Sequence, residues 1–180
     1  MRVDTDFDVL VTDRLLLRRS RPEDAETISE YRSDPDVNRH QGWERTDAEG
    51  IRAEIDEMSL RVPGEPGGWV QFSVEHRASG RLVGDVGLSA SHDEPGVIKV
   101  GYTIAPQFQG RGYATEAVRA LIDYAVGTLG ADVVRAYASS ENVPSIRVAE
   151  NAGMRLVERF EHSHGGETWS GVRYELRTRE

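Results

Sequence analysis

The pattern of apolar and polar positions along the chain predicts strands and helices that follow one another in mixed order. Runs of apolar or alternating residues between turn signals predict strands, and apolar residues spaced three and four apart predict helices. On this basis we expect strands at residues 13–19, 69–76, 82–90, 97–105, 133–138, 155–161 and 169–176. Helices are expected at residues 22–33, from 46 to about 58, from 113 onward, and at 142–151. This order is typical of an α/β domain with a mixed sheet.

Local signals indicate where several of these elements begin and end. Pro22 stands just inside the start of the first helix, and the Asp34–Pro35 pair is expected to end it. Thr46 opens a capping box at the start of the second helix. Asn142 is a favourable N-cap for the last helix, and the glycine-rich segment 62–68 reads as a surface loop.

The segment 107–116 carries the strongest functional signal. Gly110 and Gly112 lead directly into a helix whose apolar face is formed by Val118, Leu121, Ile122 and Ala125. Unpaired backbone amides and the positive end of the helix dipole meet there, and both favour a phosphate or pyrophosphate. A Walker loop is excluded because Lys99 is the only lysine, and a dinucleotide fingerprint would need glycine where Thr115 stands. Taken alone, the two glycines are equally compatible with an ordinary tight turn.

Composition narrows the class of protein. A chain of 180 residues fits one domain, for which we expect the bounds 12–176, with short extensions at 1–11 and 177–180. The net charge of −9 and the lack of a dense basic run argue against binding to nucleic acid or a membrane surface. Cysteine is absent, which excludes disulfides and thiolate catalysis and fits a cytoplasmic location.

Four segments together resemble the GNAT superfamily of acyl-CoA-dependent N-acetyltransferases, in its RimJ/RimL-like branch for ribosomal-protein N-termini. The first is the opening strand at 12–18 with the helix start at 22–25, and the second runs from Gly101–Tyr102 through the glycine loop to 117. The third spans 142–154, and the fourth is Tyr174 with Leu176. Each segment is modest alone, but their order and spacing over about 12–176 make the joint match specific.

The resemblance implies a fold and a cofactor. The fold is a mixed, mostly antiparallel seven-stranded sheet flanked by about four helices and splayed between its fourth and fifth strands, 97–105 and 133–138. The cofactor is acetyl-CoA, whose pantetheine arm would meet backbone groups of Thr103, Ile104 and Ala105. Its pyrophosphate would lie in the loop formed by Gln109, Gly110, Arg111, Gly112, Tyr113, Ala114 and Thr115. Arg111 could add a charge-assisted contact.

Acetyl transfer from a thioester to an amine develops negative charge on the carbonyl oxygen, so a protein must position two reactants and stabilise that charge. In the family, the positions of Asn142 and Ser145 contact the cofactor arm and the thiol, and the serine is a proposed proton donor to the leaving thiolate. From the residues alone, Asn142 also reads as a helix cap and Ser145 as its partner. The two interpretations are compatible.

The position two residues before Gly101–Tyr102 departs from the family, because many relatives carry an acid where this chain has Lys99. Lysine is a poor base at neutral pH unless burial lowers its pKa. We therefore expect no general base at Lys99. Deprotonation would fall to water or to another carboxylate, with Asp85 or Glu94 as the nearest candidates, or the enzyme would use an amine that is already largely neutral. Arg39, His40 and Trp43 lie between the first two helices, where the family often builds part of the acceptor pocket; packing of Trp43 is an equally good interpretation.

The sequence predicts an enzyme that transfers acetyl from acetyl-CoA to a primary amine, by direct attack in a ternary complex. The acceptor is a small-molecule amine or a protein N-terminus, and the enzyme is a monomer or homodimer. The alternative is a non-catalytic acyl-CoA-binding or sensing domain of the same fold. No metal is expected, since His162 and His164 beside the turn at 165–166 lack carboxylate or cysteine partners at ligand spacing.

Overall fold

The structure is a computed structural model that describes residues 1–41, 43, 47–164 and 167–178, excluding the side chains of 162–169. Its strands are β1 (Val9–Val11), β2 (Leu15–Arg19), β3 (Trp69–His76), β4 (Arg81–Ala90), β5 (Val97–Ile104), β6 (Val133–Ser139), β7 (Arg155–His164) and β8 (Glu167–Arg177). Its α-helices are α1 (Ala25–Arg32), α2 (Pro35–Asn38), α3 (Ala48–Ser59), α4 (Tyr113–Gly127) and α5 (Val143–Asn151). Two short 3₁₀ turns, η1 (Pro22–Asp24) and η2 (Pro106–Phe108), precede α1 and α4.

The strands form one eight-stranded sheet in the order β1-β2-β3-β4-β5-β6-β8-β7. All neighbours are antiparallel except β5 and β6, which are parallel. The predicted mixed, mostly antiparallel α/β fold is therefore confirmed, and each of the seven expected strands is present. The eighth, β1, lies in the segment that the sequence analysis treated as an extension. Its three residues are too few to show a periodic pattern, and pairing with β2 is what defines it as a strand.

Three helix boundaries differ from the sequence prediction. The first helix begins as the 3₁₀ turn η1 before α1, and the Asp34–Pro35 pair not only ends α1 but also starts the short helix α2. Asp34 caps α2 by accepting a hydrogen bond from the amide of Asp36, and proline needs no amide partner at a first helical position. Helix α3 is capped by Asp47, which accepts from the amide of Gly50, whereas the predicted cap Thr46 lies outside the described residues.

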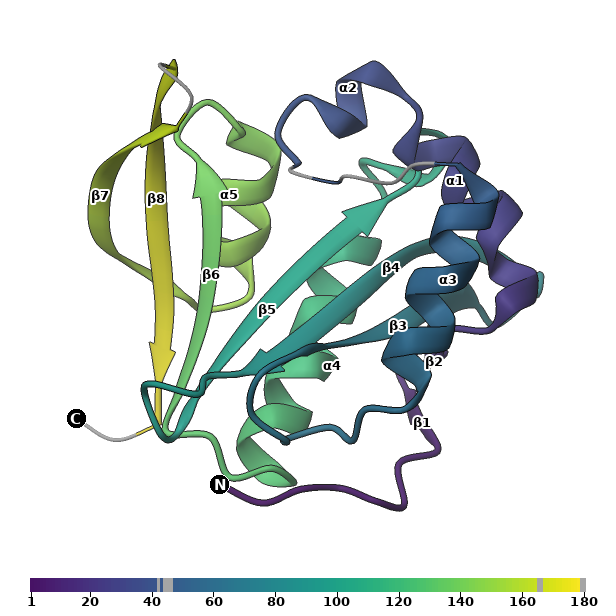
Figure 1. The fold of residues 1–180 in the computed structure, drawn as a ribbon, viewed down its shortest axis with the longest axis horizontal. Coiled ribbons are helices and arrows are strands. Elements are labelled where there is room, and N and C mark those ends of the chain that lie inside the picture. Colours follow the sequence, from purple (N-terminus) through teal and green to yellow (C-terminus); the bar gives the residue numbers. More distant parts are fainter. Residues whose placement is uncertain (42, 44–46, 165–166, 179–180) are drawn as a thin grey trace.

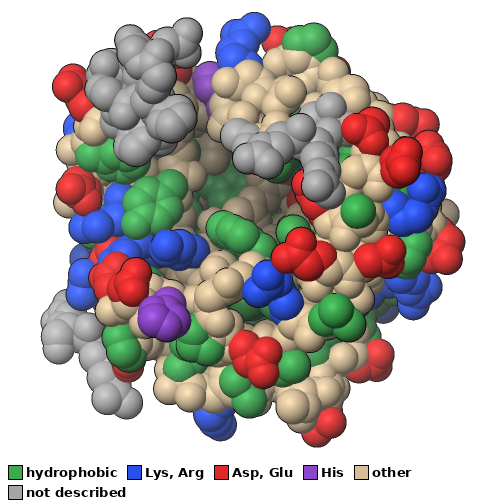
Figure 2. All heavy atoms as spheres, viewed as in Figure 1, with side chains coloured by type: hydrophobic (Ala, Val, Ile, Leu, Met, Phe, Trp, Pro, Cys, Tyr) green, Lys and Arg blue, Asp and Glu red, His purple; other side chains and the backbone are tan. Residues whose placement is uncertain are grey.

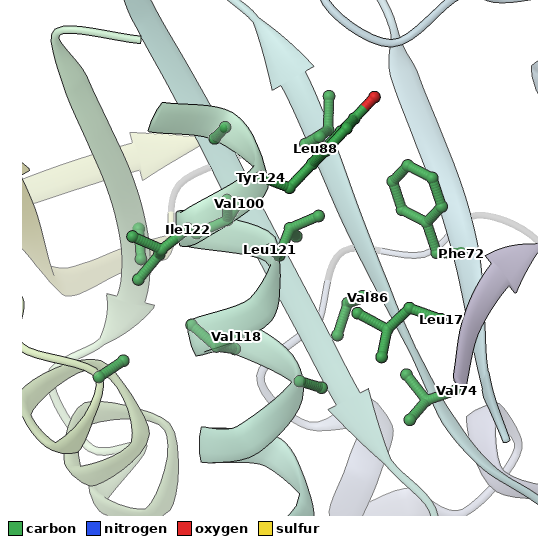
Figure 3. Close-up of a cluster of buried hydrophobic side chains, with 14 of the residues drawn as sticks. Leu17, Phe72, Val74, Val86, Leu88, Val100, Val118, Leu121, Ile122 and Tyr124 are labelled. Carbon is green, nitrogen blue, oxygen red and sulfur yellow. The ribbon is translucent and has the colours of Figure 1, made fainter. Parts of the chain in front are cut away.

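The core lies between the sheet and α4. Figure 1 shows α4 behind the sheet and α1 with α3 in front of β2, β3 and β4. In the close-up of Figure 3, Leu121 of α4 points toward the group formed by Leu17, Phe72, Val74, Val86 and Leu88 of the strands, and Val118, Ile122 and Val100 belong to the same buried cluster. All of these side chains are at most 4 % exposed, and burial of this apolar surface is the main stabilising contribution to the fold. The predicted apolar face of the helix is confirmed.

The N-terminal segment belongs to the same packed body. The ring of Phe7 lies 4.8 Å from that of Phe72 and 5.4 Å from that of Tyr124, centroid to centroid. Tyr124 donates a 2.7 Å hydrogen bond to Asp4, and the amide of Arg2 donates to the carbonyl of Leu129 at 2.6 Å. Among the described residues, no helix has the length and apolar character required to cross a membrane.

The sheet opens between β5 and β6. Their parallel pairing runs from Val97 with Val133 to Val100 with Ala136 and then ends, although β5 continues to Ile104 and β6 to Ser139. Figure 1 shows the two strands diverging beyond this point, with α5 beside β6. The splay predicted between 97–105 and 133–138 is confirmed. It leaves one edge of β5 without a partner strand.

Candidate active site

The glycine loop presents unpaired amides at the start of α4. Gly110 and Gly112 adopt positive φ values of 72° and 80°, which β-carbon-bearing residues rarely tolerate. Gly112 is the N-cap of α4, and no side chain caps the helix there. The amides of Tyr113, Ala114 and Thr115 stand at the first three helical positions, which have no intrahelical acceptor. This cradle fits a pyrophosphate, in agreement with the loop residues chosen from the sequence.

Arginines surround the loop in a chain whose net charge is −9. Arg14 donates to the carbonyl of Arg111 at 3.0 Å, and its guanidinium lies 4.8 Å from the centroid of the Tyr113 ring. Arg81 and Arg111 lie over the ring of Phe108, at 4.8 Å and 5.9 Å. The local charge is therefore positive even though the whole molecule is acidic, and a bound diphosphate would be attracted to this end of α4.

The free edge of β5 exposes the backbone of Tyr102 and Ile104 rather than that of Thr103 and Ala105. The amide of Ala105 donates to the carbonyl of Val83 on β4 at 2.9 Å. Backbone groups alternate in direction along an antiparallel strand, so Thr103 also faces β4, while Tyr102 and Ile104 face the splay. The resemblance implied free backbone groups at Thr103, Ile104 and Ala105; in the structure those of Ile104 face the splay, whereas those of Thr103 and Ala105 face β4. The sequence does not show in which direction the amides of a strand point.

Gln109 lies at the C-terminal end of the free edge of β5. Its side-chain amide donates a 2.9 Å hydrogen bond to the carbonyl of Ile104, which joins the glycine loop to the end of β5. The amide of Ile104 and both backbone groups of Tyr102 stay directed into the splay. A pantetheine arm, which carries amides of its own, could pair with them as an added strand would.

Asn142 and Ser145 stand across the splay from this edge, at the start of α5. Asn142 caps the helix by accepting a 3.1 Å hydrogen bond from the amide of Ser145, as the capping interpretation expected. The Ser145 hydroxyl instead donates to the phenol of Tyr102 at 3.1 Å, and the phenol donates to the carbonyl of Ser145 at 2.8 Å. Burial raises the pKa of Tyr102, so its phenol stays protonated at neutral pH.

Asp85 lies in front of the sheet on β4, directly opposite Thr103 of β5. Its carboxylate accepts hydrogen bonds from the hydroxyl of Tyr31 and the side-chain amide of Gln71, and Arg32 lies 4.0 Å away. Burial raises the pKa of Asp85, although Arg32 and the Tyr31 hydrogen bond act in the opposite direction. A carboxyl group with a raised pKa is a better proton acceptor than an exposed one.

The other candidates for the acceptor pocket are Trp43, Arg39 and His40, and they lie in different surroundings. The Arg32 guanidinium lies 4.6 Å from the centroid of the Trp43 ring, so Trp43 packs next to the Asp85 network. Arg39 ends α2 and pairs with Asp36 at 3.1 Å on the surface, its side chain 68 % exposed. His40 follows it and is half-buried. Trp43 therefore borders the candidate site, whereas Arg39 points to solvent.

Glu94 is a weaker candidate for a base than Asp85. Arg135 binds it through two hydrogen bonds of 2.6 Å and 3.0 Å, and these bonds lower the pKa of the Glu94 carboxyl. A carboxylate held in its charged form accepts a proton poorly. The side chains of His162 and His164, considered as metal ligands in the sequence, lie outside the described residues. Within the part of the chain that is described, no three His, Asp or Glu residues are grouped to hold a metal ion.

Two residues near the splay carry roles that sequence reasoning missed. Tyr102 was named only as part of a resemblance segment and was given no role, yet its hydroxyl contacts Ser145. Trp69 was read only as the start of a strand, yet it is 40 % exposed and lies over Gly101. The signal for Tyr102 was its place beside Gly101 in the second resemblance segment. For Trp69, the signal was an aromatic residue at a strand start one row away from a pair of glycines, which becomes visible only with the strand register.

Comparison with known proteins agrees with this geometry. Residues 14–155 match the family of the acetyltransferase (GNAT) domain. A Bacillus licheniformis protein designated uncharacterized N-acetyltransferase p20 is 29 % identical over 164 residues, which cover 88 % of this chain and 90 % of that protein. The crystal structure of a GNAT-family acetyltransferase from Bacillus anthracis superposes with a TM-score of 0.84 at 27 % identity, covering 96 % and 99 % of the two chains.

A more distant structure, Mycobacterium smegmatis RimJ in complex with a CoA-disulfide, has a TM-score of 0.78 at 19 % identity over 95 % of this chain and 85 % of that one. This likeness concerns the fold. The chain belongs to the GNAT acetyltransferase family, as the four sequence segments indicated. It is an acetyl-CoA-dependent N-acetyltransferase, so the catalytic interpretation is favoured over the binding-domain alternative.

Proposed function

We propose that the enzyme acetylates a primary amine by direct attack in a ternary complex, with both substrates bound in the splay. The observation that carries this proposal is the continuous line of free backbone groups from Tyr102 and Ile104 to the uncapped start of α4. Acetyl-CoA supplies an activated acetyl group as a thioester. The arginine-lined loop would hold its diphosphate, and the open edge of β5 would align its arm.

The reaction itself needs one bond formed and one broken. The nitrogen lone pair of the neutral acceptor forms a bond to the acetyl carbon, the carbon–sulfur bond breaks, and the sulfur leaves as thiolate. The acceptor nitrogen loses one proton and the sulfur gains one, so free CoA and an N-acetyl amide result. A backbone amide of the β5 edge, that of Tyr102 or Ile104, would stabilise the charge that develops on the carbonyl oxygen.

We assign the two proton transfers to opposite sides of β5. Ser145, held by Tyr102 and by the Asn142 cap, would donate a proton to the leaving sulfur. A thiol with a pKa of about 8.5 leaves without much help, so this donation should contribute modestly. Asp85, in front of the sheet, would receive the proton of the acceptor amine through water, since its raised pKa suits it to that role.

We also propose a cytoplasmic location, which fits the absence of cysteine. The net charge of −9 fits an acceptor that is neither a nucleic acid nor part of a membrane surface. The acceptor amine enters from the front, where Figure 2 shows the surface hollowed over the divergence of β5 and β6.

Release of free CoA from acetyl-CoA in the presence of a panel of primary amines tests the proposal. The expected result is release that depends on both acetyl-CoA and an amine, with the N-acetyl product identified by mass. A non-catalytic acyl-CoA-binding domain would bind acetyl-CoA in calorimetry but release none in the presence of any amine. The Gly112→Val variant, which fills the loop, serves as the control for cofactor binding.

A further inference from the structure

The strand register places a defined set of side chains on the front face of the sheet beside the splay. Residues directly opposite one another on paired strands share a face. One row across the sheet contains Trp69, Ser89, Lys99, Arg135 and Glu175. The next row contains Gln71, Gly87 and Gly101, and the third contains Ser73, Asp85 and Thr103. Lys99 and Asp85 therefore stand on either side of a row with two glycines.

The indole of Trp69 covers both glycines of this row. A β-carbon at Gly101 would meet the indole at 3.5 Å and 3.6 Å, and one at Gly87 would meet it at 3.2 Å. The side-chain oxygen of Gln71 also lies over Gly87, at 2.9 Å from such a β-carbon, so side chains cover both glycines. Trp69 itself is 40 % exposed, and Figure 2 shows that the front of the molecule is hollowed. We call the strip of the front face that runs from Lys99 across the exposed indole to Thr103 the trough; the indole offers an apolar surface on which a slender chain can lie.

Lys99 is the cation at one end of this trough, and it makes no ion pair or hydrogen bond within the described part of the chain. Its neighbour in the row, Arg135, is paired with Glu94 at 2.6 Å and with Glu175 at 2.9 Å. Glu94 and Glu175 are thus both paired with arginine, and Lys99 acts on Glu94 only as a nearby charge. The only lysine of this acidic chain therefore has a carboxylate in its vicinity but no direct ion-pair partner in the described structure.

The other end of the trough is anionic. Asp85 faces one cation, Arg32, whose closer partner is Glu54 at 2.9 Å, so the group carries a net negative charge when Asp85 is ionised. Lys99 and Thr103 are four residues apart on β5, or about 13 Å at ~3.3 Å per residue, and the lysine side chain can cover part of that length. The trough thus has a positive end, an aromatic middle, and a negative end near the open edge of β5.

From this arrangement we propose that the acceptor is a small amine that also carries an anionic group. Its anion pairs with Lys99, its chain lies along the exposed face of Trp69, and its amino end reaches the splay near Thr103 and Asp85. The chemical step is the transfer described above. The inference rests on the proposed function, and it names the substrate class of the same site. Lys99 and Trp69 are specificity-determining residues here and take no part in proton transfer.

Three acceptors of equal chain length test the charge of the remote end: 5-aminopentanoate, pentylamine and 1,5-diaminopentane. For the unmodified enzyme we expect kcat/KM to fall in that order, with at least a tenfold difference between the first and the last. Lys99→Glu should reverse the order, and Lys99→Gln should bring 5-aminopentanoate and pentylamine together. The differences should appear in KM, since the remote group does not react. Arg52→Glu, an equal charge change on α3 outside the trough, should keep the original order.

The middle of the trough is tested by Trp69→Ala. Trp69 is 40 % exposed, so the fold should persist while the loss of the indole raises KM for 5-aminopentanoate. Equal kcat/KM for the three acceptors, or an order unchanged by Lys99→Glu, would overturn the proposal. So would better turnover of a peptide with a free N-terminus and an acidic second residue. If none of the three is acetylated while acetyl-CoA still binds, the acceptor class is wrong; if acetyl-CoA does not bind, the proposed function itself fails.

Discussion

Arg14 at the start of β2 and Glu116 in the first turn of α4 form an ion pair with an Nη2–Oε2 distance of 2.6 Å. The same carboxylate accepts hydrogen bonds from the hydroxyl of Thr12 at 2.6 Å and from the amide of Arg14 at 2.9 Å. Arg14 also donates to the carbonyl of Arg111 within the glycine loop. The opening strand therefore fixes the position of the loop, which explains structurally why these two segments occur together in the sequence.

Glu116→Gln should weaken CoA binding and lower stability by about 1–2 kcal/mol, a range that allows for the exposure of Arg14. Burial alone would raise the pKa of Glu116, but the bonds from Thr12 and Arg14 outweigh it and lower that pKa. A carboxylate whose pKa is lower in the folded than in the unfolded state stabilises the fold at pH values above its unfolded-state pKa. This stabilisation is lost as the pH falls through the folded-state pKa. The stability gap between the two proteins should therefore be present at pH 7 and close below about pH 4.5. Thermal melts across pH measure it, and a gap that widens in acid would contradict the assignment.

Gly112→Val should impair CoA binding more than folding. A side chain at φ 80° costs about 1–2 kcal/mol, and the displaced loop would lose amide contacts to the diphosphate worth at least about tenfold each in affinity. Gly67→Val provides the matched control, because Gly67 has a φ of 97°, open space around its α-carbon and a position away from the loop. Calorimetric titration with CoA should separate the two variants. Equal affinities in two well-folded variants would rule out this loop as the diphosphate site.

Ser145→Ala should reduce kcat by about ten- to a thousandfold, the range of proton-transfer contributions, with little change in melting temperature. Tyr102→Phe removes the phenol that accepts from the Ser145 hydroxyl and should reduce kcat in the same direction. Since the two hydroxyls act as one unit, the double variant should be little worse than the poorer single variant. Additive losses, or a serine variant that melts earlier but turns over normally, would make Ser145 a structural residue only.

We expect the ionisation of Asp85 to determine how kcat/KM decreases at acidic pH. If its carboxylate accepts the proton of the acceptor, kcat/KM falls as pH drops through the pKa of Asp85, which burial raises above the ordinary value of 3.8. Asp85→Asn should lower kcat and remove that acidic limb, leaving only the ionisation of the acceptor amine. Tyr31→Phe, which deletes one hydrogen bond to the carboxylate, should shift the limb to higher pH. An unchanged limb in Asp85→Asn would assign the proton to water or another group.

The sequence alone determined the family, the order of elements and the cofactor loop. These depend on local chemistry: glycines that allow positive φ at 110 and 112, a proline or polar cap at helix starts, and apolar spacing along α4. Such signals involve residues that are close in the sequence, so they can be recognised without knowledge of the tertiary contacts. Asn142 as a cap is of this kind, and the structure shows the hydrogen bond that it makes.

Tertiary structure decided what depends on register and pairing. Which amides of β5 are free follows from its hydrogen bonds to β4, and the sequence placed Thr103 and Ala105 at an edge that belongs to Tyr102 and Ile104. The lack of a direct ion pair at Lys99, the burial that raises the pKa of Asp85, and the position of Trp69 over two glycines all depend on residues distant in the chain. Periodicity predicts on which face of the sheet a side chain lies, but it does not predict which residues are its neighbours on the adjacent strands. The acceptor side of the site could therefore be described only from the tertiary structure.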